Sequence, residues 1–325
     1  MNQTATSEQS NSIEQTTNGR ALRLQTYGGP ETMTVDQVAV SEPGPGEVLV
    51  AVKAAAVNGI DWKIREGHLR ERFKLTLPAT LGIEIAGVVL RIGHGVTQFK
   101  AGDRVLAALG GVGAYTDFLV VDAAKLVLTP EGLSDIEAAA IPVAAMTAWH
   151  VIQAVDFDLS GRRVLIQGAA GGVGGFAVQF AKATGAFVYG TASTNSLQHV
   201  LNLGADEVID YRTQTLEHLA GQIDFVVDTV GGKALDQSWA LLSPGGLLVS
   251  IAAPDAVSRA PEARRGVFLS NKPDTARLAA IAQQVADGKL KSTVAEIVGF
   301  EDLASAIERN RTGHRPGKIV ADFTR

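Results

Sequence analysis

Short apolar runs alternate with helical stretches along the second half of the chain. Each run is too short for a buried helix, and the segments between the runs have helical spacing. Uninterrupted apolar runs separated by helices are typical of parallel strands that are covered on both faces, so the pattern predicts an α/β domain. The predicted strands are 164–166, 187–189, 207–210, 224–228, 246–251 and 265–269, followed by an amphipathic helix at 275–286.

A glycine-rich turn follows the first of these runs. Residues 169–174 read A-x-G-x-x-G, and helical spacing resumes from Phe176 to Lys182. Without side chains, Gly171, Gly172 and the neighbouring Val173 could bring backbone N–H groups against a pyrophosphate. The alternative is a tight turn that serves close packing. We favour dinucleotide binding, because the five later runs complete a doubly wound Rossmann domain.

The first half of the chain has a different pattern. Residues 47–53 alternate between apolar and polar, as in an antiparallel strand, and short strands are predicted at 82–90, 103–105 and 115–121. The strand-like residues 317–323 are expected to return to this part. We therefore predict a disordered tail at 1–19, a β-rich catalytic domain at 20–146 and 289–325, and a parallel-sheet domain at 147–288.

Composition narrows the possible functions. The 325 residues include no Cys, which excludes disulfides, thiol catalysis and thiolate metal sites. The net charge is −5 and the basic residues are scattered, so nucleic acid is not expected as a partner. Neither a membrane-spanning run nor the apolar core of a signal peptide is present, which predicts a cytoplasmic protein.

Ordered motifs over nearly the whole chain carry a family resemblance. They are PGPGEVLVAVKAAAVNGIDWKIREG from Pro43, LPATLGIEIAGVVLRIGHGVTQFKAGDRV from Leu77, IPVAAMTAWHVI from Ile141, the Ala169 turn, LGADEVIDYR from Leu203 and RPGKIVADF from Arg315. From Ala21 to Phe323 the chain resembles the zinc-free medium-chain dehydrogenases/reductases of the quinone oxidoreductase (zeta-crystallin-like) group. The resemblance implies a GroES-like catalytic domain, a Rossmann domain, and NADPH-dependent reduction of a small-molecule quinone or α,β-unsaturated carbonyl.

The zinc ligands of related alcohol dehydrogenases have no counterparts in this sequence. Those relatives have Cys at the position of Asn58 and Gly-His-Glu where this chain reads Gly82-Ile83-Glu84. Isoleucine cannot bind a metal, and an asparagine amide is a poor zinc ligand. A zinc alcohol dehydrogenase is therefore excluded at the sequence level. The short-chain dehydrogenase alternative also fails, because no Tyr is followed by Lys four residues later.

The second predicted strand ends without the acidic residue that usually holds the ribose of NAD. Ser193 and Thr194 are expected to donate hydrogen bonds to a 2′-phosphate, and by the resemblance Tyr211 lies beside the adenosine ribose. Asn195 stands where close relatives often have Lys, which removes a charge-assisted contact. The alternative for Ser193 and Asn195 is ordinary helix capping. NADPH is favoured, with NADH as the open alternative.

Without a metal, the chemistry must come from positioning the reactants. By the resemblance, Asn58 and Lys63 border the nicotinamide, and Lys63 or Tyr115 donates a hydrogen bond to the developing oxyanion. Thr147 is expected either to face the nicotinamide or to be a polar residue on a buried helix. Asp61 is interpreted as a structural hydrogen-bond acceptor. The remaining cofactor contacts are predicted at Val230, Ile251, Ala252, Phe268, Leu269 and Lys318.

Two functions remain open from sequence alone. The first is an NADPH-dependent quinone or enone reductase. The second is an NADPH-binding redox sensor or structural protein with little turnover. Family habit and the apolar segment Gly246–Ile251 further suggest a homodimer with one continuous sheet across a two-fold axis.

Overall fold

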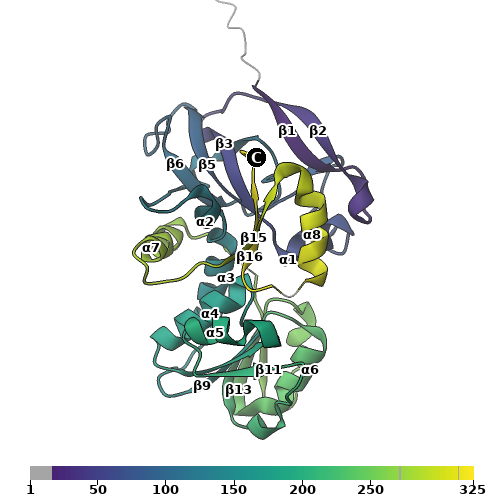
Figure 1. Ribbon diagram of the computed structural model, residues 1–325, viewed down its shortest axis with the longest axis vertical. Helices are drawn as coiled ribbons and strands as arrows, with labels where there is room; N and C mark the ends of the chain where they lie inside the picture. The colour runs from purple at the N-terminus through teal and green to yellow at the C-terminus, as the bar shows by residue number, and fades with distance from the viewer. Residues whose placement is uncertain (1–16, 271, 314) are drawn as a thin grey trace, which may run out of the picture.

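The computed structural model describes residues 17–270, 272–313 and 315–325, which form a β-rich lobe and an α/β lobe (Figure 1). Most of the predicted tail, residues 1–16, lies outside the described residues. Thr17 to Gly19 were wrongly assigned to that tail, because they open strand β1 (Thr17–Leu24) and pair with Val38 to Val40 of β2 (Met33–Val40). Backbone pairing with β2 compensates for the polar sequence of this segment.

The α/β lobe contains a six-stranded parallel sheet in the order β11-β10-β9-β12-β13-β14. In order of sequence this is 3-2-1-4-5-6, the doubly wound arrangement predicted from the apolar runs. The strands are β9 (Arg163–Gln167), β10 (Phe187–Ala192), β11 (Glu207–Asp210), β12 (Ile223–Asp228), β13 (Leu242–Ser250) and β14 (Arg265–Phe268). Its helices include α4 (Gly172–Ala183), α5 (Leu197–Asn202) and α6 (Gly232–Leu241).

Two details of this lobe differ from the sequence prediction. Helix α4 begins at Gly172, four residues before the predicted start, because the glycines of the turn already form its first turn. Strand β13 is internal, paired with β12 on one side and β14 on the other. The apolar character of Gly246–Ile251 therefore reflects burial within one sheet, and the edge strand on this side is β14.

The β-rich lobe contains two sheets. One has the order β2-β1-β4, and the other has the order β15-β16-β3-β5-β6-β8, with β7 also paired to β3. The C-terminal strand β16 (Lys318–Asp322) pairs antiparallel with β3 (Glu47–Ala56), so it returns to this lobe as predicted. The remaining strands are β4 (Ala79–Thr80), β5 (Glu84–Ile92), β6 (Arg104–Ala108), β7 (Phe118–Asp122), β8 (Val127–Leu128) and β15 (Val294–Gly299).

One of the buried apolar clusters extends across both lobes, in addition to a cluster within each lobe. A single buried cluster joins Ala54 and Leu106 of the β-rich lobe to Val164 and Ile166 of the parallel sheet. Helix α3 (Pro142–Gln153) runs between the lobes, so the predicted domain boundary at residues 146/147 falls inside a helix (Figure 1). The other α-helices are α1 (Gly59–Arg65), α2 (Asp135–Ala139), α7 (Thr275–Ala286) and α8 (Leu303–Thr312). Within residues 17–270, 272–313 and 315–325, no helix combines the length and apolar character that crossing a bilayer requires.

Candidate functional site

The glycine turn lies where the strand order of the parallel sheet reverses. It follows β9, and the neighbours β10 and β12 continue the sheet in opposite directions along the sequence. Crevices at the carboxyl ends of strands beside such a switch point are the usual ligand sites of doubly wound sheets. Most of the predicted cofactor contacts follow the carboxyl ends of β9 to β14. The fold therefore gathers them at the carboxyl-terminal end of the parallel strands.

The glycines of the turn have distinct structural roles. A Cβ on Gly174 would lie 2.1 Å from the carbonyl oxygen of Gly168, so helix α4 and strand β9 pack together only with glycine here. A Cβ on Gly171 would lie 3.4 Å from the same oxygen, and this part of the turn is not crowded. The first N–H groups of α4 have no carbonyl acceptors within their own helix. The turn therefore offers unshielded backbone donors at a helix N-terminus, which suits a pyrophosphate.

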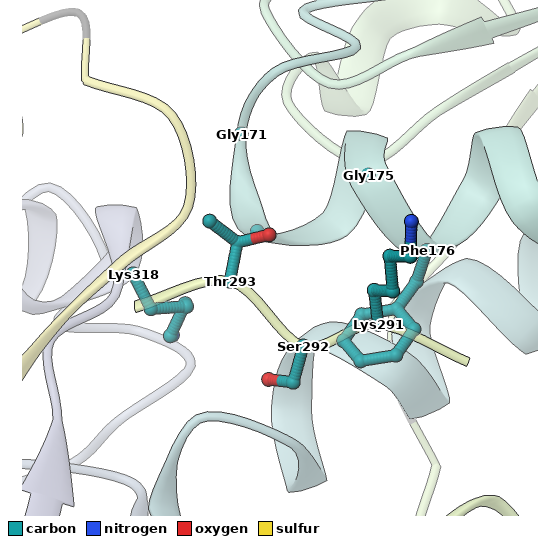
Figure 2. A pocket seen from close by; sticks show the side chains of 8 residues that line it. Gly171, Gly175, Phe176, Lys291, Ser292, Thr293 and Lys318 are labelled. Carbon is teal, nitrogen blue, oxygen red and sulfur yellow. The ribbon is translucent and has the colours of Figure 1, made fainter. Parts of the chain in front are cut away.

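Lys318 lies directly against this turn. Lys318 and Thr293 line a small pocket beside Gly171 and Gly172 (Figure 2). A Cβ on Gly172 would lie 2.6 Å from Cδ of Lys318, and the N–H of Gly317 donates to the carbonyl of Ala170 at 2.8 Å. The returning strand is thus joined to the dinucleotide turn by both backbone and side-chain contacts.

The ammonium of Lys318 is turned away from solvent. Lys318 is 6% exposed, and its Nζ lies 2.8 Å from Oε1 of Glu84 and 2.5 Å from Oδ1 of Asn58. The Nδ2 of Asn58 donates to the same Glu84 oxygen at 2.8 Å. Three groups that are far apart in sequence therefore form one buried polar cluster. Asn58 and Lys318 were predicted from the sequence as site residues, whereas Glu84 was considered only as part of a zinc motif that this chain lacks.

Asp61 and Tyr115 form a second buried pair. The hydroxyl of Tyr115 donates to Oδ2 of Asp61 at 2.6 Å, and the backbone N–H of Asn58 donates to the same oxygen at 2.7 Å. Burial raises the pKa of Asp61 from 3.8 to about 6, although both hydrogen bonds act to lower it. Asp61 is the structural acceptor that was predicted. The oxyanion role predicted for Tyr115 is not supported, because its side chain is fully buried and its only proton is directed to Asp61.

Two further residues predicted at the nicotinamide end have different surroundings. Thr147 is 6% exposed on α3, and this burial fits both interpretations that the sequence left open. Lys63 lies on α1, with its ammonium 5.7 Å from the centre of the Trp62 ring. Its place beside the nicotinamide remains a prediction, as does the role of Thr147.

The predicted adenosine end combines two neighbouring strands. The hydroxyl of Thr194 donates to Oδ2 of Asp210, and this bond helps to lower the pKa of the Asp210 carboxyl. Ser193 is buried, with Oγ 3.2 Å from Oγ of Ser196. The Thr194 hydroxyl is thus directed to Asp210, whereas either serine oxygen can donate in the Ser193–Ser196 contact, and the role of both residues at a 2′-phosphate remains a prediction. Asn195 and Tyr211 are exposed here.

A buried carboxylate organises the loops after β12 and β13. Asp228 accepts the N–H groups of Val230 and Gly231 at 3.0 and 2.8 Å, and the hydroxyl of Ser250 at 2.6 Å. Ser250 in turn accepts the N–H of Ala252 at 3.1 Å. These bonds fix the backbone at Val230 and Ala252, two of the predicted cofactor contacts. Asp228 was not among the predicted site residues, although an acidic residue at the end of an apolar strand was a usable signal in the sequence.

Side chains able to hold a metal do not gather at the former zinc position. Asn58 Oδ1 accepts the Lys318 ammonium, and Ile83 offers no ligand atom. In the described part of the chain, no three His, Asp or Glu side chains come together in a way that could hold a metal ion.

Two protein families match the chain. Residues 44–131 match the family described as alcohol dehydrogenase GroES-like domain, and residues 203–320 match zinc-binding dehydrogenase. Neither match covers the glycine turn itself. The first segment covers β3 to β8 of the β-rich lobe, and the second runs from the end of α5 into β16.

Individual relatives match along most of the chain. The chloroplast envelope quinone oxidoreductase homolog of Arabidopsis thaliana is 31% identical, over 93% of this chain and 98% of the relative. The NADPH-dependent alkenal/one oxidoreductase of the same plant is 33% identical, over 90% of this chain and 77% of the relative. The structure of the quinone oxidoreductase from Coxiella burnetii superposes with a TM-score of 0.88 at 29% identity, covering 94% of this chain and 99% of that one.

Proposed function

The chain belongs to the medium-chain dehydrogenase/reductase family, and we propose that it catalyses zinc-independent, NADPH-dependent reduction of quinones or α,β-unsaturated carbonyls. One observation carries the proposal. The glycine turn at the switch point of the sheet lies against Lys318 at the start of β16, and the ammonium of Lys318 donates a hydrogen bond to the side chain of Asn58. Lys318 thereby links the backbone donors proposed for a pyrophosphate to the side-chain amide proposed for the nicotinamide end.

The residues present suit a nicotinamide dinucleotide. The N–H groups of Gly172 and Val173 would hold the pyrophosphate, and Asn58 and Thr147 would border the nicotinamide. When bound, the cofactor supplies the hydride. The protein contributes alignment and a donor for the oxygen that becomes negative. With Tyr115 committed to Asp61, Lys63 is the proposed donor.

The printed names of relatives support the substrate class. One is named a quinone oxidoreductase homolog and another an alkenal/one oxidoreductase. Both names describe acceptors in which a carbonyl oxygen gains charge as hydride is transferred, and a positioned cation stabilises that charge without a metal.

NADPH is proposed over NADH on narrower grounds. Ser193 and Thr194 remain the proposed donors to a 2′-phosphate, and the exposed Tyr211 is proposed to lie beside the adenosine ribose. The Asp210 carboxylate nearby opposes a phosphate, and its bond to Thr194 disperses part of that charge. The name of one relative, an NADPH-dependent oxidoreductase, also supports this choice. A homodimer and a cytoplasmic location are likewise proposed.

The direct test is a panel assay. The oxidation of NADPH and of NADH is followed at 340 nm with small quinones, enones and saturated aldehydes, before and after exhaustive dialysis against a chelator. We expect turnover with quinones or enones, a lower KM for NADPH than for NADH, and no loss on chelation. Tight NADPH binding without turnover on any acceptor would contradict the proposal and favour a redox sensor.

A further inference from the structure

Glu84 is a fully buried carboxylate with hydrogen-bond partners from three different elements. Its Oε1 accepts Nζ of Lys318 and Nδ2 of Asn58, each at 2.8 Å, and its Oε2 accepts the N–H of Val143 at 2.7 Å. A charge with 0% exposure requires such partners, because removal from water is otherwise very costly. Both carboxylate oxygens are therefore committed to fixed positions.

Each partner of Glu84 controls a different wall of the candidate site. Asn58 precedes α1, and both ends of its amide are held, one by Glu84 and the other by Lys318. Val143 is in the first turn of α3, where a carboxylate also interacts favourably with the helix dipole. Thr147 lies four residues later and thus on the same face of that helix.

The third partner connects Glu84 to the opposite side of the cleft. The side chain of Lys318 crosses the face of Gly172 before its ammonium reaches Glu84, and the preceding Gly317 is bonded to Ala170. One carboxylate thus fixes the relative positions of the amide at residue 58, the start of α3 and the strand that touches the dinucleotide turn.

We propose that Glu84 is a positioning residue for hydride transfer, an inference that rests on the proposed function of the same site. Glu84 does not touch the reactants. It orients the Asn58 amide and holds α3 in register with the glycine turn. Its loss therefore reduces the rate of the chemical step much more than it weakens dinucleotide binding, which depends on backbone donors of α4.

Glu84→Gln is the first variant, because it keeps the shape and removes the charge. We expect kcat at saturating NADPH to fall roughly tenfold or more, while the Kd of NADPH, titrated by fluorescence without acceptor, changes less than about threefold. Glu84→Asp should not rescue kcat, because the shorter side chain cannot reach Asn58 and Val143 together. Glu296→Gln is the matched control. Glu296 lies on β15 and its carboxylate pairs with Arg309 and Arg315, so its removal should leave both kcat and the Kd of NADPH unchanged.

A double-variant cycle keeps the test informative if a single variant folds poorly. Lys318→Met leaves the Glu84 carboxylate without its ammonium partner, whereas Glu84→Gln combined with Lys318→Met removes both charges of this buried pair. The loss of kcat and the drop in melting temperature of the apo protein should both be smaller in the double variant than the two single effects combined.

Three results would overturn the positioning role: parental kcat in Glu84→Gln, a rise in Kd that matches the whole fall in kcat/KM, or additive effects in the cycle. Failure of the proposed function is a separate result. In that case the parent itself oxidises no NADPH with any acceptor, while the cycle on the apo protein still reports the coupling of Glu84 to Lys318.

Discussion

The effect of substituting a residue in the glycine turn or in the buried polar cluster depends on which atoms lie in contact with that residue. Gly172 illustrates this, because its missing Cβ leaves room both for an approaching pyrophosphate and for the methylenes of Lys318. Lys318 and a bound pyrophosphate can approach the backbone at residue 172 only because glycine has no side chain.

Gly172→Asp should abolish NADPH binding. A carboxylate at this position repels the pyrophosphate in a partly desolvated turn and displaces Lys318, and a loss of several kcal/mol corresponds to a Kd raised by roughly 100-fold or more. Fluorescence titration with NADPH measures the effect. Gly111→Asp is the control, because a side chain there meets no atom within 4 Å, and it should bind NADPH normally. Parental affinity in Gly172→Asp would refute the assignment of the turn as the pyrophosphate site.

Asp61→Asn should change how stability depends on pH. Because the pKa of Asp61 is raised from 3.8 to about 6 in the folded protein, ionising this carboxyl disfavours the folded state. The resulting loss in the free energy of unfolding is absent below about pH 4 and grows as the pH rises from 4 through 6. It reaches about 3 kcal/mol above pH 6.

The Asp61→Asn variant lacks this titration. Relative to the parent, its free energy of unfolding should therefore improve by about 3 kcal/mol between pH 4 and pH 8. Urea unfolding at several pH values provides the measurement. Parallel pH profiles for the two proteins would show that Asp61 does not titrate with a raised pKa.

At the scale of the elements, the sequence predicted the strands of the α/β lobe well. Their apolar runs are uninterrupted and bounded by turns, so local pattern was sufficient to place β9 to β14. The start of α4 was missed because glycine has little helix propensity, and it is the contact with β9 that holds this first turn.

The polar partners within the site could not be predicted in the same way. Glu84 and Lys318 are separated by 234 residues, and Thr194 meets Asp210 only because β10 and β11 are neighbours in the sheet. The role given to Tyr115 failed for a similar reason. Its hydroxyl is bound by a carboxylate 54 residues away, and no local spacing indicates this.

Gly174→Ala tests the packing of α4 on β9. Its Cβ would lie 2.1 Å from the Gly168 carbonyl oxygen and 2.9 Å from Cα of Ala169, both backbone atoms that cannot rotate away. We expect a loss of about 1–3 kcal/mol in stability, even though alanine favours helix formation. Gly175→Ala is the matched variant, because its Cβ would meet only the flexible end of Leu203 closely, at 3.1 Å. Equal melting temperatures for the two variants would contradict the packing role of Gly174.

For the whole molecule, metal content provides a decisive measurement. We expect purified protein to contain no stoichiometric zinc, because Ile83 offers no ligand and the Asn58 oxygen accepts an ammonium. Elemental analysis after dialysis checks this. About one zinc per chain, resistant to chelation, would overturn the zinc-independent mechanism.

Assembly is the second property at this scale. We expect a mass near twice the 34.0 kDa of one chain by light scattering at micromolar concentration. Because β13 is internal, any continuous parallel sheet across a two-fold axis must form through one of the two edge strands, β14 or β11. A monomeric mass would refute the predicted homodimer.

The contact between β16 and the glycine turn also has a consequence for synthesis. Residues 163–268 are synthesised before residues 317–318, so all six strands of the parallel sheet leave the ribosome before Lys318 and its strand. During this interval Glu84 is without its ammonium partner and β3 lacks β16 at one edge. The cleft is therefore completed late in translation, and a chain that stops before residue 317 has its dinucleotide turn but not the strand that joins this turn to Asn58.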